Sequence, residues 1–261
     1  MRFARLGLSM KRVGHIFISH THGDHCMGLP GLICTMSLLG RTSQLHVHAP
    51  QGLEPFLQTA LQTFCPDLDF QVLFHPVDTT CHQLIHEDRS IEVWSLPLRH
   101  RVPCCGYLFR EKPGLPHIRR EMIDMYEIPV SQINNIKAGQ DWTMPDGTVI
   151  PNSRLTAPPS PTRSFAYCSD TTFLPSLAEQ VHGVDLLFHE ATFPKDDDLR
   201  ARQTFHSTSD DAARLALMAQ VSHLCIGHYS ARIKDETQLL HEAQAIFPNT
   251  FLAQEGLKIS I

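Results

Sequence analysis

The chain has 261 residues, which is enough for one large domain or two small ones, and a hydrophobic content of 42% allows a substantial core. Its net charge of -5 excludes a globally basic nucleic-acid-binding protein, so contact with RNA or DNA would need a local basic patch. There is no run of about eighteen apolar residues and no apolar segment behind the N-terminal residues 1–5, so neither a membrane span nor a signal peptide is expected. The eight scattered cysteines are therefore expected as free buried thiols, and the protein is predicted to be cytoplasmic.

The chain begins with a basic segment, residues 1–12, which is typical of a short amphipathic helix with a solvated charged face. The apolar run 13–18 then predicts a buried strand. This strand leads directly into His20-Thr21-His22-Gly23-Asp24-His25. Because His20 and His22 are two residues apart, an extended backbone points both imidazoles to the same side. Gly23 permits a sharp turn that brings Asp24 and His25 to a second point close by.

This short motif is predicted to be a metal centre. Four nitrogen and oxygen ligands within six residues favour two adjacent ions over one tetrahedral ion. Imidazole and carboxylate ligands without a thiolate pair suit catalytic zinc, and less often manganese or iron. The alternative is a chance polar loop in a chain with 17 histidines, but a buried strand running straight into the motif argues against chance.

Helices and strands then alternate. Apolar spacing predicts helices at 26–39 and 51–64, and strands at 45–48, 70–74, 83–86 and 91–98. The second helix is expected to bury one face, formed by Leu53, Phe56, Leu57, Ala60, Leu61 and Phe64.

The histidines of this part fall into two kinds. His100 follows a strand and precedes a turn, which is where long-range ligands are often mounted. The others are expected at the surface or at the edge of the core rather than as ligands, because no carboxylate falls at a useful spacing. These are His46, His48, His75, His82 and His86.

Residues 111–160 differ in composition, with more Pro, Gly, Lys and Arg. Helices are predicted at 117–125 and 130–138, a turn at Asp146-Gly147, and a proline-rich linker at 158–161. We interpret the segment as an excursion from a single domain. Its basic residues around Arg119 form either a solvated face or a contact with RNA.

In the last third, three apolar strands are followed by polar residues that can act in catalysis. Strand 164–169 ends at Asp170, strand 186–188 at His189-Glu190, and strand 225–227 at His228. A helix at 212–220 is expected to be capped by Ser207 or Thr208, and a helix at 236–246 and a strand at 257–261 close the chain. Alternating strands and helices with metal-binding groups at strand ends indicate a layered α/β fold.

Taken in order, these motifs resemble RNase Z, the tRNA 3′-processing endonuclease family of the metallo-β-lactamase superfamily. The matching pieces cover most of the chain and are Ile18–His25 with Gly28-Leu29-Pro30-Gly31-Leu32, His100, Ser169-Asp170-Thr171, His189-Glu190-Ala191-Thr192-Phe193, His206-Ser207-Thr208 and His228-Tyr229-Ser230-Ala231-Arg232. The resemblance implies a four-layer αβ/βα sandwich.

The resemblance also implies a site, residue by residue. His20, His22 and His100 would hold one zinc ion, Asp24, His25 and His228 a second, and Asp170 would bridge them; manganese or iron is the alternative metal. Asp24 would also hold the attacking hydroxide, His206 would donate a proton to the leaving oxygen, and Glu190 would orient His206. Ser230 and Arg232 would lie near the scissile or adjacent phosphate, since an arginine fits phosphate oxygens better than lysine does.

For this family, the expected substrate is precursor tRNA, whose 3′ trailer is removed to leave a tRNA 3′-hydroxyl, and the expected assembly is a homodimer. Members begin with further strands and a Gly-rich loop before the stretch that aligns with residues 1–12, so the first sheet is expected to lack its N-terminal part here. Thr21 replaces a common leucine, and residues 111–140 stand at the position of the family's tRNA-binding arm. The alternatives are another hydrolase of the superfamily, phosphodiesterase-like or arylsulfatase-like, and a non-catalytic zinc-binding or RNA-binding module.

Overall fold

The structure, a computed structural model, describes residues 6–261. The chain divides into two compact units. The first comprises the residues up to 86 together with 93–109 and 164–261, and the second comprises 87–92 and 110–163. The excursion expected at 111–160 makes up most of the second unit. We describe each unit by itself.

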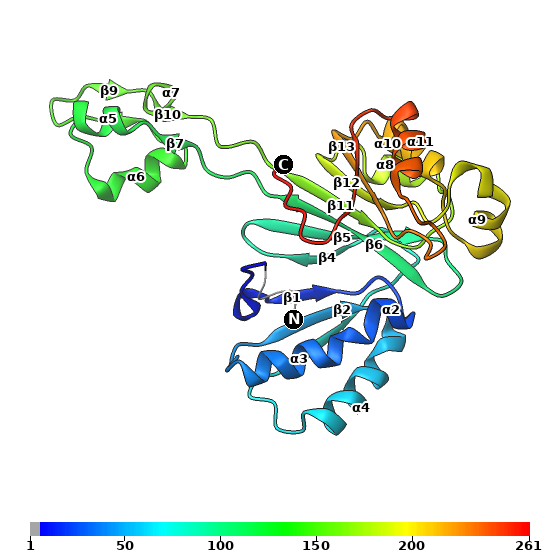
Figure 1. Cartoon of the computed structure of the whole chain (residues 1–261). Helices are drawn as coiled ribbons and strands as arrows, with labels where there is room; N and C mark the ends of the chain where they lie inside the picture. The colour runs from blue at the N-terminus through cyan, green and yellow to red at the C-terminus, as the bar shows by residue number, and fades with distance from the viewer. Residues whose placement is uncertain (1–5) are drawn as a thin grey trace. The chain divides into compact units, whose positions relative to one another are not determined.

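A small parallel sheet opens the first unit. Its strands are β1 (His15–Phe17), β2 (Leu45–Ala49) and β3 (Val72–Pro76), in the order β1-β2-β3. Helices α3 (Gly28–Leu38) and α4 (Glu54–Phe64) cover one face (Figure 1). Leu45 and Val47 point to this face and pack with Ile33 of α3 and Leu57 of α4, as period-two alternation requires.

The buried face of α4 is narrower than expected. Leu53, Leu57 and Leu61 are buried, but Phe56 is 42% exposed and Phe64 is 73% exposed. The prediction of a buried position for these two phenylalanines was wrong. Residues four apart share a helix face, and the two phenylalanines lie beside the leucine stripe rather than on it.

A larger sheet of seven strands has the order β14-β13-β12-β11-β6-β5-β4. Its central strands β11, β12 and β13 are parallel and strongly apolar, as expected for strands covered on both faces. Leu187 and Leu224 of these strands pack with Leu215 of α10 in the main core. The elements are β4 (Leu84–Glu87), β5 (Ile91–Leu98), β6 (Cys104–Glu111), β11 (Ser164–Cys168), β12 (Leu186–Glu190), β13 (His223–Gly227), β14 (Thr250–Leu252), α8 (Leu177–Gln180), α10 (Ser209–Ala219) and α11 (Thr237–Ile246).

The two sheets face each other inside the first unit. The Phe17 ring of β1 lies 5.3 Å from the rings of both Tyr107 and Phe109 of β6. The Tyr107 hydroxyl donates a hydrogen bond to the carbonyl oxygen of Ile18 at 2.7 Å. With α3 and α4 outside one sheet and α8, α10 and α11 outside the other, the order is helix, sheet, sheet, helix (Figure 1). The expected four-layer αβ/βα arrangement is confirmed.

The second unit has its own small core, which includes Tyr126, Ile136 and Leu155. The predicted turn at Asp146-Gly147 is confirmed, and Gly147 adopts a φ of +87°, which favours glycine. The predicted helix at 117–125 starts later, because His117–Ile118 pair as a strand. The elements are β7 (His117–Ile118), α5 (Arg120–Met125), α6 (Val130–Lys137), β8 (Trp142–Thr143), β9 (Val149–Ile150), α7 (Asn152–Leu155) and β10 (Thr156–Ala157).

Both ends of the chain depart from expectation. Of the helix predicted at 1–12, residues 1–5 lie outside the described part; Gly7 then has a φ of +70°, and only a 3-10 turn, η1 (Met10–Arg12), follows. The strand predicted at 257–261 was wrong, because the last strand is β14 and the alternating apolar residues beyond it remain partly exposed without a pairing partner strand.

Three further findings concern the described residues. The predicted cap is Thr208, whose side chain accepts a hydrogen bond from the backbone of Asp211 at the start of α10. All eight cysteines are free, five of them buried. Within residues 6–261, no helix is both long enough and apolar enough to cross a membrane.

Candidate metal centre

The seven predicted ligands come together at one end of the strands, although they lie far apart in the sequence. The chain leaves β1 and places His20 and His22 before a short helix, α2 (Gly23–Cys26), which carries Asp24 and His25. His100, Asp170 and His228 follow β5, β11 and β13. The ligand atoms form two groups, within each of which they lie no more than 4.8 Å apart. One is His20, His22, His100 and Asp170, and the other is Asp24, His25 and His228.

The Asp170 carboxylate lies between the two groups and faces both. Its Oδ2 is 3.7 Å from Nε2 of His20 and 3.7 Å from Nε2 of His100. Its Oδ1 is 3.5 Å from Nε2 of His25 and 3.3 Å from Nε2 of His228. One carboxylate with its oxygens divided in this way can bridge two ions.

The spacing within the first group fits a shared ion. Nε2 of His20 lies 3.1 Å from Nδ1 of His22, which lies 3.2 Å from Nε2 of His100. Two nitrogens bound to one tetrahedral zinc ion at the usual bond length are separated by roughly 3.3 Å. Burial, followed by the neighbouring His25, lowers the pKa of His20 to about 4. The imidazole is therefore neutral at pH 7, which is the form that binds metal.

In His20 and His100, the second ring nitrogen is held by an outer contact. Nδ1 of His20 lies 3.0 Å from the Ser19 hydroxyl, and Nδ1 of His100 donates to the Phe205 carbonyl oxygen at 3.0 Å. Phe205 ends α9 (Asp198–Thr204) in a left-handed conformation with φ of +59°. Such contacts set the tautomer and the orientation of a metal ligand.

His228 has a strained backbone, and a hydroxyl group holds its ring. Its φ of +61° lies in the left-handed region, which is costly for a residue with a side chain. Its Nδ1 lies 2.9 Å from the Thr192 hydroxyl, so its Nε2 remains directed at Asp170. Thr192 belongs to the His-Glu-Ala-Thr motif, but no role was predicted for it.

Next to the two groups, His206 and Glu190 form a hydrogen-bonded pair. Nδ1 of His206 lies 2.9 Å from Oε1 of the fully buried Glu190. The carboxylate also accepts the backbone N–H groups of Thr171 at 2.6 Å and Ser207 at 3.1 Å, which fix its position. Burial opposes protonation of His206, but the hydrogen bond and the charge of Glu190 outweigh it, and the pKa of His206 is raised.

A pocket of about 310 Å³ opens onto these groups. It brings His206 to the same space as ligands of both groups. Arg101, Thr192 and Arg200 also line it, and none of them was predicted. Arg200 had no recognisable motif around it. The lining residues are His22, Asp24, His100, Arg101, Asp170, Thr192, Phe193, Arg200, Thr204, His206 and His228.

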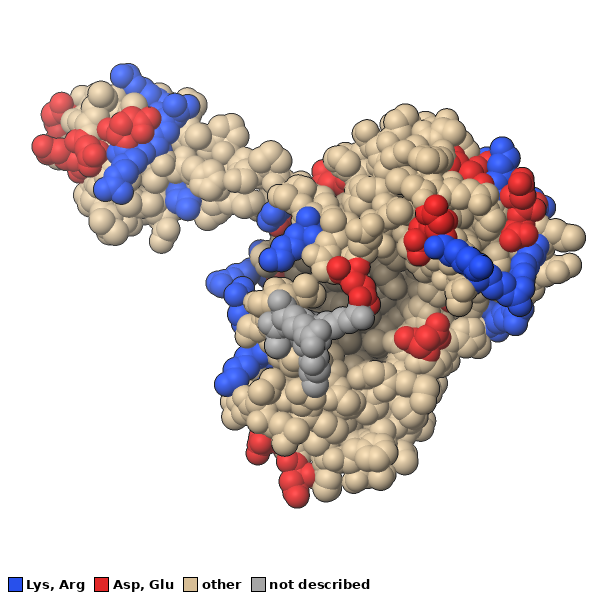
Figure 2. Space-filling model, in the orientation of Figure 1, with Lys and Arg blue, Asp and Glu red and all other residues tan. Residues whose placement is uncertain are grey.

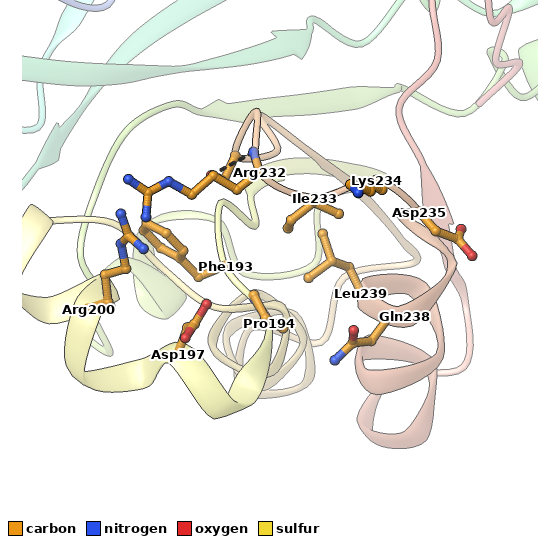
Figure 3. A pocket seen from close by; sticks show the side chains of 11 residues that line it. Phe193, Pro194, Asp197, Arg200, Arg232, Ile233, Lys234, Asp235, Gln238 and Leu239 are labelled. Carbon is orange, nitrogen blue, oxygen red and sulfur yellow. Dashed lines mark hydrogen bonds between the residues drawn. The ribbon is translucent and has the colours of Figure 1, made fainter.

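Ser230 and Arg232 lie in a neighbouring pocket of about 380 Å³, which shares Phe193 and Arg200 with the metal pocket. Figure 3 shows the ends of the Arg232 and Arg200 side chains close to the Phe193 ring. The Arg200 guanidinium carbon is 5.4 Å from the centre of that ring. Lys234 lines the same pocket, and so do the carboxylates of Asp197 and Asp235, so the charge of its lining is mixed.

The chain is similar to several curated proteins over its whole length. It is 54% identical to ribonuclease Z of Bacteroides fragilis strain YCH46 over 261 residues, which cover 100% of the chain and 86% of the relative. It is 53% identical to ribonuclease Z of Bacteroides thetaiotaomicron (100% and 83% covered) and 50% identical to that of Porphyromonas gingivalis strain W83 (100% and 86% covered). No protein-family model matches the chain.

Solved structures show the fold. The short form of human tRNase Z superposes with a TM-score of 0.68 at 22% identity, covering 100% of this chain and 83% of that one. The metallo-β-lactamase fold protein YhfI of Bacillus subtilis gives 0.61 at 17% identity, covering 95% and 78%. The metallo-β-lactamase fold implied by the motifs is thereby confirmed.

Proposed function

Because the chain belongs to the ribonuclease Z family, we propose that it removes the 3′ trailer of precursor tRNA by hydrolysis at the two groups of ligands around Asp170. It is a metal-dependent hydrolase and an endoribonuclease of tRNA processing. The observation that carries the proposal is the Asp170 carboxylate, with one oxygen facing each group.

The donor set fits two divalent ions. His20, His22 and His100 would hold one ion, Asp24, His25 and His228 the other, and Asp170 both. Imidazole and carboxylate ligands without thiolate suit zinc, with manganese or iron as the alternative. Bound there, two ions would lower the pKa of a shared water molecule and neutralise the charge of the phosphodiester.

Asp24 is placed to orient the nucleophile. Its side chain is largely exposed, it lines the metal pocket, and its Oδ2 lies 3.5 Å from Nε2 of His25. A carboxylate at the mouth of the pocket can accept a hydrogen bond from the attacking water and hold it in line with the scissile bond.

His206 is proposed as the proton donor to the departing 3′-oxygen. The raised pKa keeps its imidazole protonated nearer to neutral pH, and a general acid works best with a pKa close to the working pH. Glu190 positions the ring and stabilises its cationic form. The products are then a tRNA with a 3′-hydroxyl and a trailer with a 5′-phosphate.

The arginine-lined part of the neighbouring pocket is proposed to hold a phosphate next to the scissile one. Arg232, Ser230 and Arg200 line it. Figure 2 shows lysine and arginine side chains, with acidic side chains among them, over this part of the first unit, where Figure 1 places α9. Arginine offers a planar fork of donors that matches two phosphate oxygens at once.

The second unit is proposed as the tRNA-binding arm of the family. Its surface carries a band of lysine and arginine side chains next to an acidic patch (Figure 2). Arg119, Arg120, Lys137 and Arg154 belong to this unit. With a net charge of -5 for the chain as a whole, such local bands are what a polyanionic RNA would contact.

The family resemblance supports a homodimer in the cytoplasm, in which one subunit's arm holds the tRNA that the other subunit cuts. Light scattering at the concentration of the cleavage assay tests this assembly. A monomeric mass together with full cleavage would contradict it.

The direct test of the function is cleavage of a precursor tRNA that carries a 3′ trailer, in the presence of zinc or manganese, with the ends of both products determined. We expect a 3′-hydroxyl on the tRNA and a 5′-phosphate on the trailer. Intact metal binding with hydrolysis of small phosphodiesters but no cleavage of the RNA would instead favour a general phosphodiesterase.

A further inference from the structure

Five histidines of the first unit meet where the two sheets face each other. They are His15 of β1, His46 and His48 of β2, His75 of β3, and His86 of β4, and we call them the histidine cluster. None of them belongs to the groups around Asp170.

Strand register explains the gathering. His15 of β1 pairs with His46 of β2, and His48 of β2 pairs with His75 of β3. Leu45, Val47 and Ala49 alternate with His46 and His48 and pack under the helices, so the two imidazoles point to the opposite face, toward the larger sheet. An inner face that apolar side chains would ordinarily fill is thus lined by imidazoles.

Three members of the cluster have the geometry of metal ligands. The candidate ligand atoms of His15, His48 and His86 all lie within 4.8 Å of one another. Nδ1 of His15 is 3.1 Å from Nε2 of His48. This distance equals the 3.1 Å between His20 and His22, which belong to one group of the metal centre. The ring centres of His15 and His86 are 4.0 Å apart.

The buried member of the trio has an unmet polar atom. His48 is 2% exposed, and its Nδ1 has no hydrogen-bond partner. The nitrogen that faces His15 is Nε2, so Nε2 is the candidate ligand atom of His48, and Nδ1 is not the atom that the ion would contact. Burial and the neighbouring His75 lower the pKa of His48 to about 3, so the ring is neutral at pH 7.

We propose that His15, His48 and His86 bind a transition-metal ion, zinc or a similar imidazole-binding metal, at a site separate from the centre around Asp170. Three imidazoles without a carboxylate suit zinc, copper or nickel and do not suit magnesium, calcium or manganese, which prefer oxygen ligands. The site goes beyond the proposed cleavage reaction and does not depend on it.

The other two histidines support this trio. Nδ1 of His46 lies 2.8 Å from Nε2 of His75, and the His46 ring stacks on His15 with centres 4.6 Å apart. Bound metal would join β1 and β2 of the small sheet to β4 of the larger one. An ion that binds only the folded state stabilises that state, so the site would act as a clamp between the sheets.

The test is to count zinc ions bound to the full chain by equilibrium dialysis and elemental analysis. His86→Ala is the main variant, because His86 is half-buried on the terminal strand of its sheet and its loss threatens folding less than the loss of His48. His82→Ala is the matched control, since His82 is exposed and stacks on Trp94 outside the cluster.

We expect His86→Ala to bind one zinc ion per chain fewer than the unchanged chain, and His82→Ala to bind the same number. Added zinc should also raise the melting temperature of the unchanged chain more than that of His86→Ala. Equal zinc counts in the unchanged chain and in His86→Ala would overturn the proposal and leave the cluster as stacked, hydrogen-bonded imidazoles. His15→Gln provides a second variant with the same two outcomes.

Discussion

The first unit contains two sets of histidines, one in the centre around Asp170 and one in the histidine cluster. They differ in their position in the fold and in whether carboxylates accompany them. The centre around Asp170 lies beyond the strand ends, includes the carboxylates of Asp24 and Asp170, and opens into a pocket. The histidine cluster lies within the strands, between the sheets, and the candidate ligand trio there consists of imidazoles alone. Strand ends leave room for a substrate and for loops that bring in a proton donor, whereas strand interiors do not. The same residue type can therefore serve chemistry in one place and cohesion in the other.

Among variants that leave the proposed metal ligands in place, the largest effect is expected for His206→Ala, which removes the proposed proton donor. Cleavage should fall by about 10²–10⁴-fold, the usual contribution of a positioned general acid. Metal content should stay unchanged. Unaltered cleavage with full metal content would show that His206 is not the proton donor.

A smaller loss is expected for Thr192→Val, which keeps the shape of the side chain and removes the hydroxyl beside Nδ1 of His228. Outer contacts of metal ligands typically contribute about 10–100-fold to metal affinity or activity. Cleavage against zinc concentration measures this effect. Thr63→Val, on the exposed side of α4, is the control and should behave as the unchanged chain. If both variants matched the unchanged chain, the contact would have no part in holding the ligand.

A shift in pH dependence is expected for Glu190→Gln. His206 must be protonated to donate, so the cleavage rate falls as pH rises through its pKa. Glu190 helps to raise that pKa against the effect of burial, and Gln removes the charge. The alkaline side of the rate profile should therefore move to lower pH. A profile that keeps its alkaline limit would mean that Glu190 does not tune the donor.

The smallest effect is a difference in the number of bound ions, which distinguishes the centre around Asp170 from the trio of the histidine cluster. Manganese prefers oxygen ligands, which the centre around Asp170 supplies and the trio of His15, His48 and His86 does not. The chain should bind one ion per chain fewer with manganese than with zinc, and His86→Ala should not lower the manganese count. A manganese count equal to the zinc count would show that the two sites do not differ in the metals they bind.

The sequence predicted that the candidate ligands around Asp170 would come together, because they follow apolar strands. The end of a strand can be recognised in the sequence where an apolar run gives way to polar residues. Parallel strands bring these ends to the same edge of a sheet. The hydrogen bonds that orient the ligand side chains were not predictable in this way. The Phe205 carbonyl that fixes His100 comes from a residue 105 positions away, and its direction depends on a left-handed backbone at the end of α9.

The histidine cluster was missed for a different reason. His46, His48, His75 and His86 were expected at the surface or the edge of the core because no carboxylate stands near them in the sequence. Their meeting with His15 depends on which residues pair across β1, β2 and β3 and on how the second sheet faces the first. Register and sheet packing are tertiary properties, and the spacing of residues along one strand does not reveal them.

The proposed metal centre depends most on Asp170, whose carboxylate faces both groups of ligands. The measurement that tests it most directly is the metal content and the precursor-tRNA cleavage rate of Asp170→Ala, compared with the unchanged chain under the same zinc concentration. We expect the centre to bind both ions more weakly and cleavage to be lost. Full occupancy of both ions in Asp170→Ala would contradict the assignment of Asp170 as the bridge and, with it, the proposed dimetal centre.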